Sequence, residues 1–251
     1  MTSLYTDAAA VTRPERLPVP ARALTIGAHP DDAEFGAGGT LAAWARGGCE
    51  ISMLVVTDGS KGSWDPEASA AALASARLAE QVAAARALGA TGELIHLGYV
   101  DGELEYTMEL RRQLCEWIRR LRPQVVLSHD PWRRYMLHPD HRATGFGAID
   151  GVVAARDHLF FPELGLEKHR PEAVLLWAAD EPDYWEDVAA TFDIKIEALL
   201  CHSSQTRTTM NDAHNGEESR LAFVTRMREW CGRQGEGVGL ALAESFKLLR
   251  P

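Results

Sequence analysis

Short apolar runs alternate with longer helical patterns along the first half of the chain. Residues 24–28, 51–57, 93–97 and 124–128 are apolar or β-branched runs typical of buried strands. Between them, residues 36–47, 68–88 and 108–121 have the composition or periodicity of helices. This alternation predicts βαβ units and a mostly parallel sheet flanked by helices, in an α/β fold.

The second half of the chain gives a weaker pattern. Residues 173–177 predict a fifth strand, residues 194–201 a short helix and residues 217–231 an amphipathic helix. Residues 240–249 fit a strand and a helix equally well. The chain of 251 residues contains no repeat or low-complexity block, so we expect a single domain at residues 21–251 after an N-terminal arm at residues 1–20.

Composition and charge narrow the classes of function. The formal net charge is −10, which disfavours a general nucleic-acid binder because such proteins need a basic face. No apolar run approaches the roughly 20 residues of a membrane span. The four cysteines form no Cys-x-x-Cys pair, which argues against a thiolate metal site and fits a reducing compartment. We therefore expect a cytoplasmic protein that binds neither nucleic acid nor membrane.

Three side chains that bind metals or relay protons follow the first predicted strand. They are His29, Asp31 and Asp32, and Pro30 between them ends the strand because it has no amide hydrogen. A Gly-rich turn is expected next, before the helix that starts near Gly36. In parallel α/β proteins, ligands bind just past the carboxyl ends of the strands.

A second cluster of the same kind follows the fourth predicted strand. Pro139 suits the first position of a helix, and residues three apart in that turn share one side, so His138 and His141 can face the same crevice. In the doubly wound strand order 3-2-1-4, the first and fourth strands are neighbours. The two clusters are therefore predicted to meet.

Two histidines and one carboxylate with an open coordination position form the ligand set of catalytic zinc in hydrolases. His29, Asp32 and His141 supply this set, which leaves Asp31 and His138 for proton transfer. Asp140 is placed to orient His138. The same ligands also hold ferrous iron, so Fe²⁺ is the alternative to Zn²⁺. A competing structural interpretation is that these residues cap helices and fix turns, but two clusters that meet favour a metal site.

Two segments of the chain resemble the signature motifs of the PIG-L/LmbE family of zinc-dependent N-deacetylases. They are Ala28-His29-Pro30-Asp31-Asp32 with the following Gly36-Ala37-Gly38-Gly39-Thr40-Leu41-Ala42, and His138-Pro139-Asp140-His141-Arg142. Weaker similarities lie at Thr57-Asp58-Gly59, Arg77-Leu78-Ala79-Glu80 and His202-Ser203-Ser204-Gln205. One position departs from the commonest pattern, since Ala33 stands where the family has Glu and Glu34 follows it. We expect this change to affect loop packing or substrate preference.

The resemblance implies a Rossmann-like fold and hydrolysis of an acetamide on an amino sugar. It implies that His29, Asp32 and His141 bind the metal, Asp31 is the general base, His138 is the acid or oxyanion stabiliser, and Asp140 orients it. Substrate contacts are expected from Arg77, Asp101, Tyr135 and His202. Tyr135 belongs to the loop of residues 132–137, whose arginines and aromatics suit an anionic or sugar substrate.

The leading hypothesis is thus a zinc-dependent deacetylase of N-acetylglucosaminyl-type small molecules, formed by a PIG-L/LmbE-like domain at residues 21–251. One alternative is an amidase that cleaves a larger, mycothiol-like thiol conjugate. A third hypothesis is a metal-stabilised ligand-binding protein without turnover; Asp31 argues against it, because a structural site has no use for a spare carboxylate. Homo-oligomerisation is left open.

Overall fold

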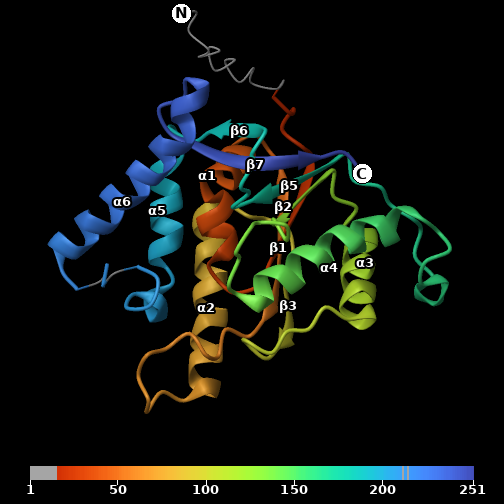
Figure 1. Cartoon of the computed structure of the whole chain (residues 1–251), viewed down its shortest axis with the longest axis horizontal. Coiled ribbons are helices and arrows are strands. Elements are labelled where there is room, and N and C mark those ends of the chain that lie inside the picture. Colours follow the sequence, from red (N-terminus) through yellow and green to blue (C-terminus); the bar gives the residue numbers. More distant parts are fainter. Residues whose placement is uncertain (1–15, 211, 214) are drawn as a thin grey trace, which may run out of the picture.

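One mixed sheet forms the centre of the computed structural model, which describes residues 16–210, 212, 213 and 215–251 (Figure 1). Its strands are β1 (Arg22–Gly27), β2 (Glu50–Thr57), β3 (Leu94–Tyr99), β4 (Val125–His129), β5 (Ala173–Trp177), β6 (Tyr184–Asp187) and β7 (Ala243–Leu249). They lie in the order β3-β2-β1-β4-β5-β7-β6. The first five strands are parallel, whereas β7 runs antiparallel to both of its neighbours. The predicted strand order 3-2-1-4 is confirmed.

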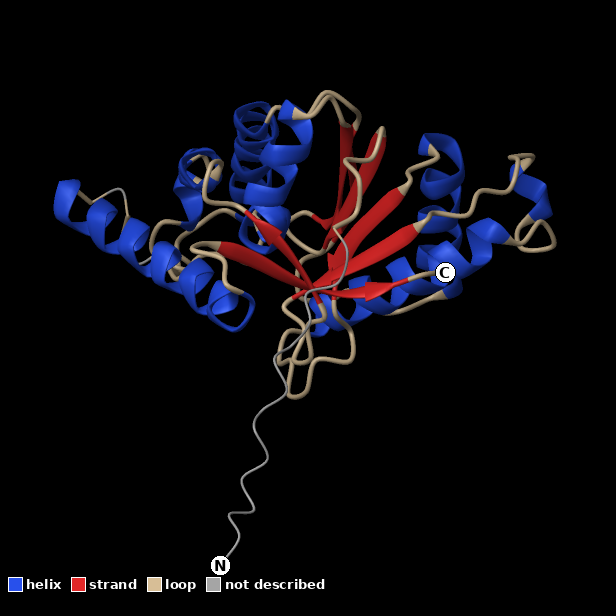
Figure 2. Cartoon of the chain, turned by 90° about the horizontal axis from the view of Figure 1, so that it is seen from above, coloured by secondary structure: helices blue, strands red, loops and turns tan. Residues whose placement is uncertain are grey.

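Helices cover both faces of this sheet (Figures 1 and 2). They are α1 (Asp32–Arg46), α2 (Ala70–Leu88), α3 (Met108–Leu121), α4 (Pro139–Arg156), α5 (Phe192–Leu200) and α6 (Glu217–Gly235). One apolar core joins α1, α2 and α5 to the sheet, and a second joins α3 and α4 to the opposite face. A smaller core packs α6 against α5. The Rossmann-like α/β fold is therefore confirmed.

Burial on both faces explains why the strands read as continuous apolar runs. On β1, Ala23 packs into the core of α1 and α2, whereas Leu24 and Ile26 pack into the core of α3 and α4. A strand with only one buried face would alternate apolar and polar residues. The sheet thus brings the carboxyl ends of β1, β2, β3, β4 and β5 to one edge.

The start of α1 differs from the prediction. The helix begins at Asp32, so the glycines expected to form a turn lie inside it. An alanine in place of Gly36 would put its Cβ 2.5 Å from the Trp177 ring, and an alanine in place of Gly39 would put one 2.6 Å from Val188. The glycines are therefore needed for close packing of the helix, not for a turn conformation.

A buried ion pair adds side-chain hydrogen bonds to the backbone of α1. In a regular helix the Gly39 N–H and the Phe35 carbonyl are partners of each other. Here the Gly39 N–H donates to Glu244 Oε1 of β7 over 2.9 Å, and the Phe35 carbonyl accepts from Lys195 Nζ of α5 over 2.7 Å. Lys195 and Glu244 lie 2.6 Å apart and are both fully buried. The pair fixes α1 against β7 and α5.

The C-terminal part holds a strand that sequence reasoning missed. Residues 184–187 form β6, a four-residue strand at the sheet edge, and residues 243–249 form β7 beside it. The end of the N-terminal arm lies against β6, where Arg16 Nε donates to Glu186 over 3.0 Å; residues 1–15 of the arm lie outside the described part. All four cysteines are free. Among the described helices, none has the length and apolarity of a membrane span.

Candidate metal centre and its cavity

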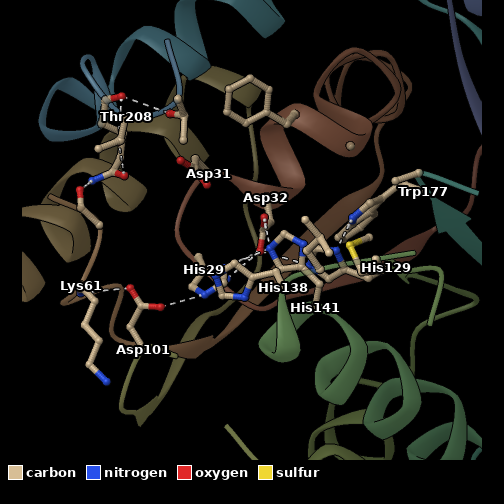
Figure 3. Close-up of a pocket in the computed structure, with 18 of the residues that line it drawn as sticks. His29, Asp31, Asp32, Lys61, Asp101, His129, His138, His141, Trp177 and Thr208 are labelled. Carbon is tan, nitrogen blue, oxygen red and sulfur yellow. Dashed lines mark hydrogen bonds and ion pairs between the residues drawn. The ribbon is translucent and has the colours of Figure 1, made fainter. Parts of the chain in front are cut away.

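The two predicted His–Asp clusters meet at the carboxyl edge of the parallel strands (Figure 3). His29 and Asp31 follow β1, and Asp32 is the first residue of α1. His138 is the N-cap of α4, and His141 lies in the first turn of that helix. Because β1 and β4 are neighbours, the residues that follow them are adjacent.

The side chains of His29, Asp32 and His141 form a triangle, in which Asp32 presents a different oxygen to each histidine. His29 Nδ1 lies 3.2 Å from His141 Nε2 and 3.4 Å from Asp32 Oδ2, and His141 Nε2 lies 3.4 Å from Asp32 Oδ1. Nitrogen and oxygen ligands of a tetrahedral cation at about 2.0–2.1 Å are spaced by about 3.3–3.4 Å. The spacing of these side chains is thus close to that of metal ligands. Among the described residues, the groups whose ligand atoms all lie within 4.8 Å of one another are His29, His138 and His141; His29, Asp101, His138 and Asp140; and Asp32, His129 and His141.

Carboxylates on the far side of His29 determine which of its nitrogens faces the other ligands. His29 Nε2 lies 3.1 Å from Asp101 Oδ1 and 3.1 Å from Asp140 Oδ2. Burial alone would lower the pKa of His29, but its hydrogen bonds to Asp101, Asp140 and Asp32 raise it well above its usual value. Because these carboxylates keep a proton on Nε2, the ring would bind a metal through Nδ1 after losing the Nδ1 proton, as in carboxylate–histidine–metal arrangements.

Asp140 therefore has a different partner from the one predicted. It was expected to orient His138, yet its hydrogen bonds join His29 and the backbone N–H groups of Gly102 and Leu104, at 2.7 and 3.3 Å. The physical reason is its position in the first turn of α4, which points the carboxylate at the loop after β3. Asp140 is fully buried there.

His129 and Trp177 orient Asp32 in a similar way. Trp177 Nε1 donates to His129 Nδ1 over 3.1 Å, and His129 Nε2 lies 3.1 Å from Asp32 Oδ2 and 3.2 Å from the Ala28 backbone nitrogen. The acceptor role of Nδ1 favours the tautomer whose Nε2 proton points to Asp32. Burial lowers the pKa of His129 to about 4, which keeps the ring neutral in this tautomer. Sequence reasoning did not assign a role to Trp177. The observation that could have indicated this role is that His129 and Trp177 are paired across the ends of the neighbouring strands β4 and β5.

Asp31 occupies a strained position beside the triangle. Its φ of 97° lies in the left-handed region, which is uncommon for residues other than glycine. The Asp31 N–H donates to Gln81 Oε1 over 3.2 Å, and its Oδ2 lies 3.5 Å from Arg77 Nη2. Among the described residues, this buried Oδ2 has no hydrogen-bond partner. Burial raises the pKa of Asp31 to about 6, against the opposing effect of the Arg77 charge.

Three buried polar side chains, Gln81, Glu34 and His202, form a chain of contacts that begins at the Asp31 backbone. Gln81 Nε2 donates to Glu34 Oε1 over 2.7 Å, and His202 Nε2 lies 3.8 Å from Glu34 Oε2. Glu34, which follows the Ala33 that replaces the family's usual Glu, therefore contacts the residues that hold Asp31. His202 is fully buried and is not among the cavity-lining residues, so the structure places it behind Asp31 and out of reach of a substrate.

The other predicted residues take different positions around the cavity. Arg77 and Asp101 both line it, and Arg77 Nη1 also donates to the Gly59 carbonyl over 3.1 Å. His138 lines it too, with a buried Nδ1 that has no hydrogen-bond partner within the described chain. Burial and the neighbouring His29 and His141 charges lower the pKa of His138. Tyr135 is 87% exposed and lies in a separate pocket beside Asp180.

The cavity has a volume of about 970 Å³. This volume lies near the top of the range of small-molecule sites, about 300–1,000 Å³. The candidate metal centre lies in its wall, and Asp31 lines the same cavity. Fold and site together define an α/β protein with a candidate metal centre and a neighbouring base at the carboxyl edge of its sheet.

Comparisons with known proteins agree with this class. The PIG-L family model, described as GlcNAc-PI de-N-acetylase, matches residues 24–152, and the chain belongs to this family. Diacetylchitobiose deacetylase of Thermococcus kodakarensis is 38% identical over 73% of this chain and 70% of its own length. The structure of N,N'-diacetylchitobiose deacetylase from Pyrococcus horikoshii is similar with a TM-score of 0.83 and 30% identity, covering 92% of this chain and 84% of that one.

One relative is named for a different reaction. The 4-oxalmesaconate hydratase of Pseudomonas putida is 28% identical over 73% of both chains. Family membership alone therefore does not specify the reaction, and the reaction of this chain has to be inferred from the residues of its own site.

Proposed function

We propose that this protein is a metal-dependent hydrolase that removes the N-acetyl group from N-acetylglucosaminyl-type small molecules. The observation that carries the proposal is the triangle of His29, Asp32 and His141 beside the Asp31 carboxylate, whose Oδ2 has an ion-pair contact with Arg77 but no hydrogen-bond partner among the described residues. The two diacetylchitobiose deacetylases among the relatives support the same substrate type.

His29, Asp32 and His141 would hold the cation, for which we propose Zn²⁺, with Fe²⁺ as the alternative. Bound there, the cation would supply Lewis acidity and lower the pKa of a water molecule to about 7. The spacing of 3.2–3.4 Å between donor atoms of these three side chains supports this assignment. His129 and Asp140 keep Asp32 and His29 in the required orientation.

The proton transfers are assigned to Asp31 and His138. Asp31 accepts a proton from the attacking water, because it lines the cavity beside the ligand triangle and burial raises its pKa to about 6. His138 hydrogen-bonds the developing oxyanion or protonates the leaving amine from the other side of the ligand triangle. Its ring centroid lies 4.5 Å from that of His29 and 4.7 Å from that of His141.

Arg77 and Asp101 remain the proposed substrate contacts because both line the cavity. Each also holds a neighbouring group, since Arg77 pairs with Asp31 and Asp101 pairs with His29. The positions of Tyr135 and His202 do not support such a role for them.

The proposal is tested by amine release from a panel of substrates. The panel contains N-acetylglucosaminides, diacetylchitobiose, a cysteinyl-glucosaminyl thiol conjugate and an unsaturated dicarboxylic acid. We expect the zinc-loaded chain to release amine from the acetylated sugars, and chelator-treated chain to lose that activity. Cleavage of the thiol conjugate alone would favour the amidase alternative, and hydration of the acid alone would favour the hydratase chemistry of the relative. A chain that binds one metal without turning over any compound would favour the ligand-binding alternative.

The assignment of residues 21–251 to one deacetylase domain and the cytoplasmic location remain predictions. Fractionation of the producing cells tests the location.

A further inference from the structure

One wall of the cavity is formed by α6, outside the segment that the family model matches. Arg226, Met227, Trp230 and Arg233 line the cavity, whereas the family match ends at residue 152. Residues 226, 230 and 233 are spaced as i, i+4 and i+7, so they lie on one face of the helix. This wall is therefore a place where the chain can differ in specificity from other family members.

The charge of this wall is opposite to that of the chain. The protein has a formal net charge of −10, yet the cavity is lined by Arg133, Arg226 and Arg233 in addition to Arg77 beside the base. The carboxylates that line the cavity are Asp31, Asp32 and Asp101, and all three belong to the metal centre. The α6 wall thus contributes two guanidinium groups and no acid.

Within the described residues, Arg133, Arg226 and Arg233 also lack carboxylate partners. In the described ranges of the chain, Arg133, Arg226 and Arg233 form no ion pair, although eight ion pairs of other arginines are present. Arg228, which does not line the cavity, differs in that it pairs with Asp193 at 3.8 Å. Among the described residues, Arg133, Arg226 and Arg233 are therefore the cavity-lining cations that are available to an anion from solution.

Two residues of the wall are held in place before any ligand binds. The Arg226 guanidinium donates to the Thr209 carbonyl over 3.2 Å and lies 5.5 Å from the centroid of the buried Phe223 ring. Trp230 is held by the buried Lys195 ammonium, 5.0 Å from its ring centroid. Preorganisation of this kind lowers the entropy cost of binding. Guanidinium groups bind carboxylates and phosphates through paired hydrogen bonds.

We propose that the α6 wall is an anion subsite, and that the preferred substrates are N-acetylglucosaminides whose second group carries a carboxylate or a phosphate. This inference rests on the proposed function of the metal centre. The acetamido sugar occupies the space beside Asp31 and His138, and the anionic group contacts Arg226 and Arg233, with Trp230 between them. The volume of about 970 Å³ leaves room for both parts.

The test compares kcat/KM for three compounds: methyl N-acetylglucosaminide, N-acetylglucosamine 1-phosphate, and an N-acetylglucosaminide of a hydroxy acid. Hydrogen bonds to charged groups are worth enough to change an equilibrium by about 10- to 100-fold. We expect the wild-type chain to prefer one of the two anionic compounds over the methyl glycoside by a factor in this range. The anionic compound with the higher kcat/KM shows whether the subsite prefers a phosphate or a carboxylate.

The variant Arg226→Gln/Arg233→Gln should reduce the ratio of anionic to neutral kcat/KM by about 10-fold or more. The matched control is Arg228→Gln on the same helix, which should leave the ratio unchanged because Arg228 faces Phe192, 4.4 Å from its ring centroid. High salt should reduce the wild-type ratio, since ions screen the arginines. An unchanged ratio in the double variant, or equal turnover of neutral and anionic compounds by wild type, would overturn the anion subsite.

Calorimetric binding of the same compounds separates this inference from the proposed function. If no compound is turned over but N-acetylglucosamine 1-phosphate or the hydroxy-acid glycoside binds, and binding is lost in the double variant, the subsite stands and the deacetylase proposal fails. If the methyl glycoside is turned over without any preference for anions, the deacetylase proposal stands and the subsite is refuted.

Discussion

Breaking the buried ion pair of Lys195 and Glu244 should destabilise the whole domain. Lys195→Met removes the ammonium and leaves the Glu244 carboxylate buried, with the Gly39 and Thr40 amides and the Thr40 hydroxyl as its remaining partners. Removal of one partner from a buried pair costs about 3–5 kcal/mol, because the remaining charge stays out of water. For a chain of this size we expect a fall in Tm of about 6–20 °C.

Thermal unfolding followed by circular dichroism measures this effect, and Lys247→Met is the matched control. Lys247 pairs with Asp183 at the same distance of 2.6 Å, but the two side chains are 38% and 47% exposed. An exposed pair contributes at most about 1 kcal/mol, so the control should unfold close to the wild-type temperature. Glu244→Gln in the Lys195→Met background should recover part of the loss, since it removes the uncompensated charge. Equal, small shifts for both lysine variants would refute the argument from burial.

Three further predictions concern the metal centre and α1. His141→Ala should abolish stoichiometric zinc binding by removing one of three ligands, as measured by metal analysis after gel filtration. Asp140→Asn should weaken zinc affinity about 10- to 100-fold in a chelator competition, because it replaces a carboxylate that orients His29; unchanged affinity would contradict that role. Gly39→Ala should cost about 1–3 kcal/mol in urea unfolding, since its Cβ would lie 2.6 Å from Val188, whereas Gly237→Ala, with nothing within 4 Å, serves as the control.

The fold and the meeting of the two clusters were predictable because they depend on local sequence and one topological rule. A strand buried on both faces needs a continuous apolar run, so β1, β2 and β4 are visible in the sequence. Once β1 and β4 are neighbours, the residues that follow them must be adjacent. His29 and His141, separated by 112 positions, could therefore be placed together.

Other features depend on contacts between distant segments and leave no local signal. The helix α1 begins at Asp32 and includes Gly36, which packs against Trp177 of the distant strand β5. The local sequence does not show this contact. The partner of Asp140 depends on the direction of the first turn of α4, which the His-Pro-Asp-His pattern does not specify. The burial of His202 follows from the packing of Glu34 and Gln81 over it. The strand β6 has only four residues, which are too few to show the alternation of apolar and polar positions that would predict a strand.

The central claim is that Asp31 acts as a base beside a metal held by other residues. The most direct measurement is the rate of amine release from an N-acetylglucosaminide by Asp31→Asn, with zinc content determined on the same preparation. Our account predicts one zinc per chain, as in wild type, and a loss of activity of about 10²- to 10⁴-fold. Asp180→Asn, which changes an acid in the separate pocket, should keep the wild-type rate. Full turnover by the zinc-loaded Asp31→Asn chain would contradict the account.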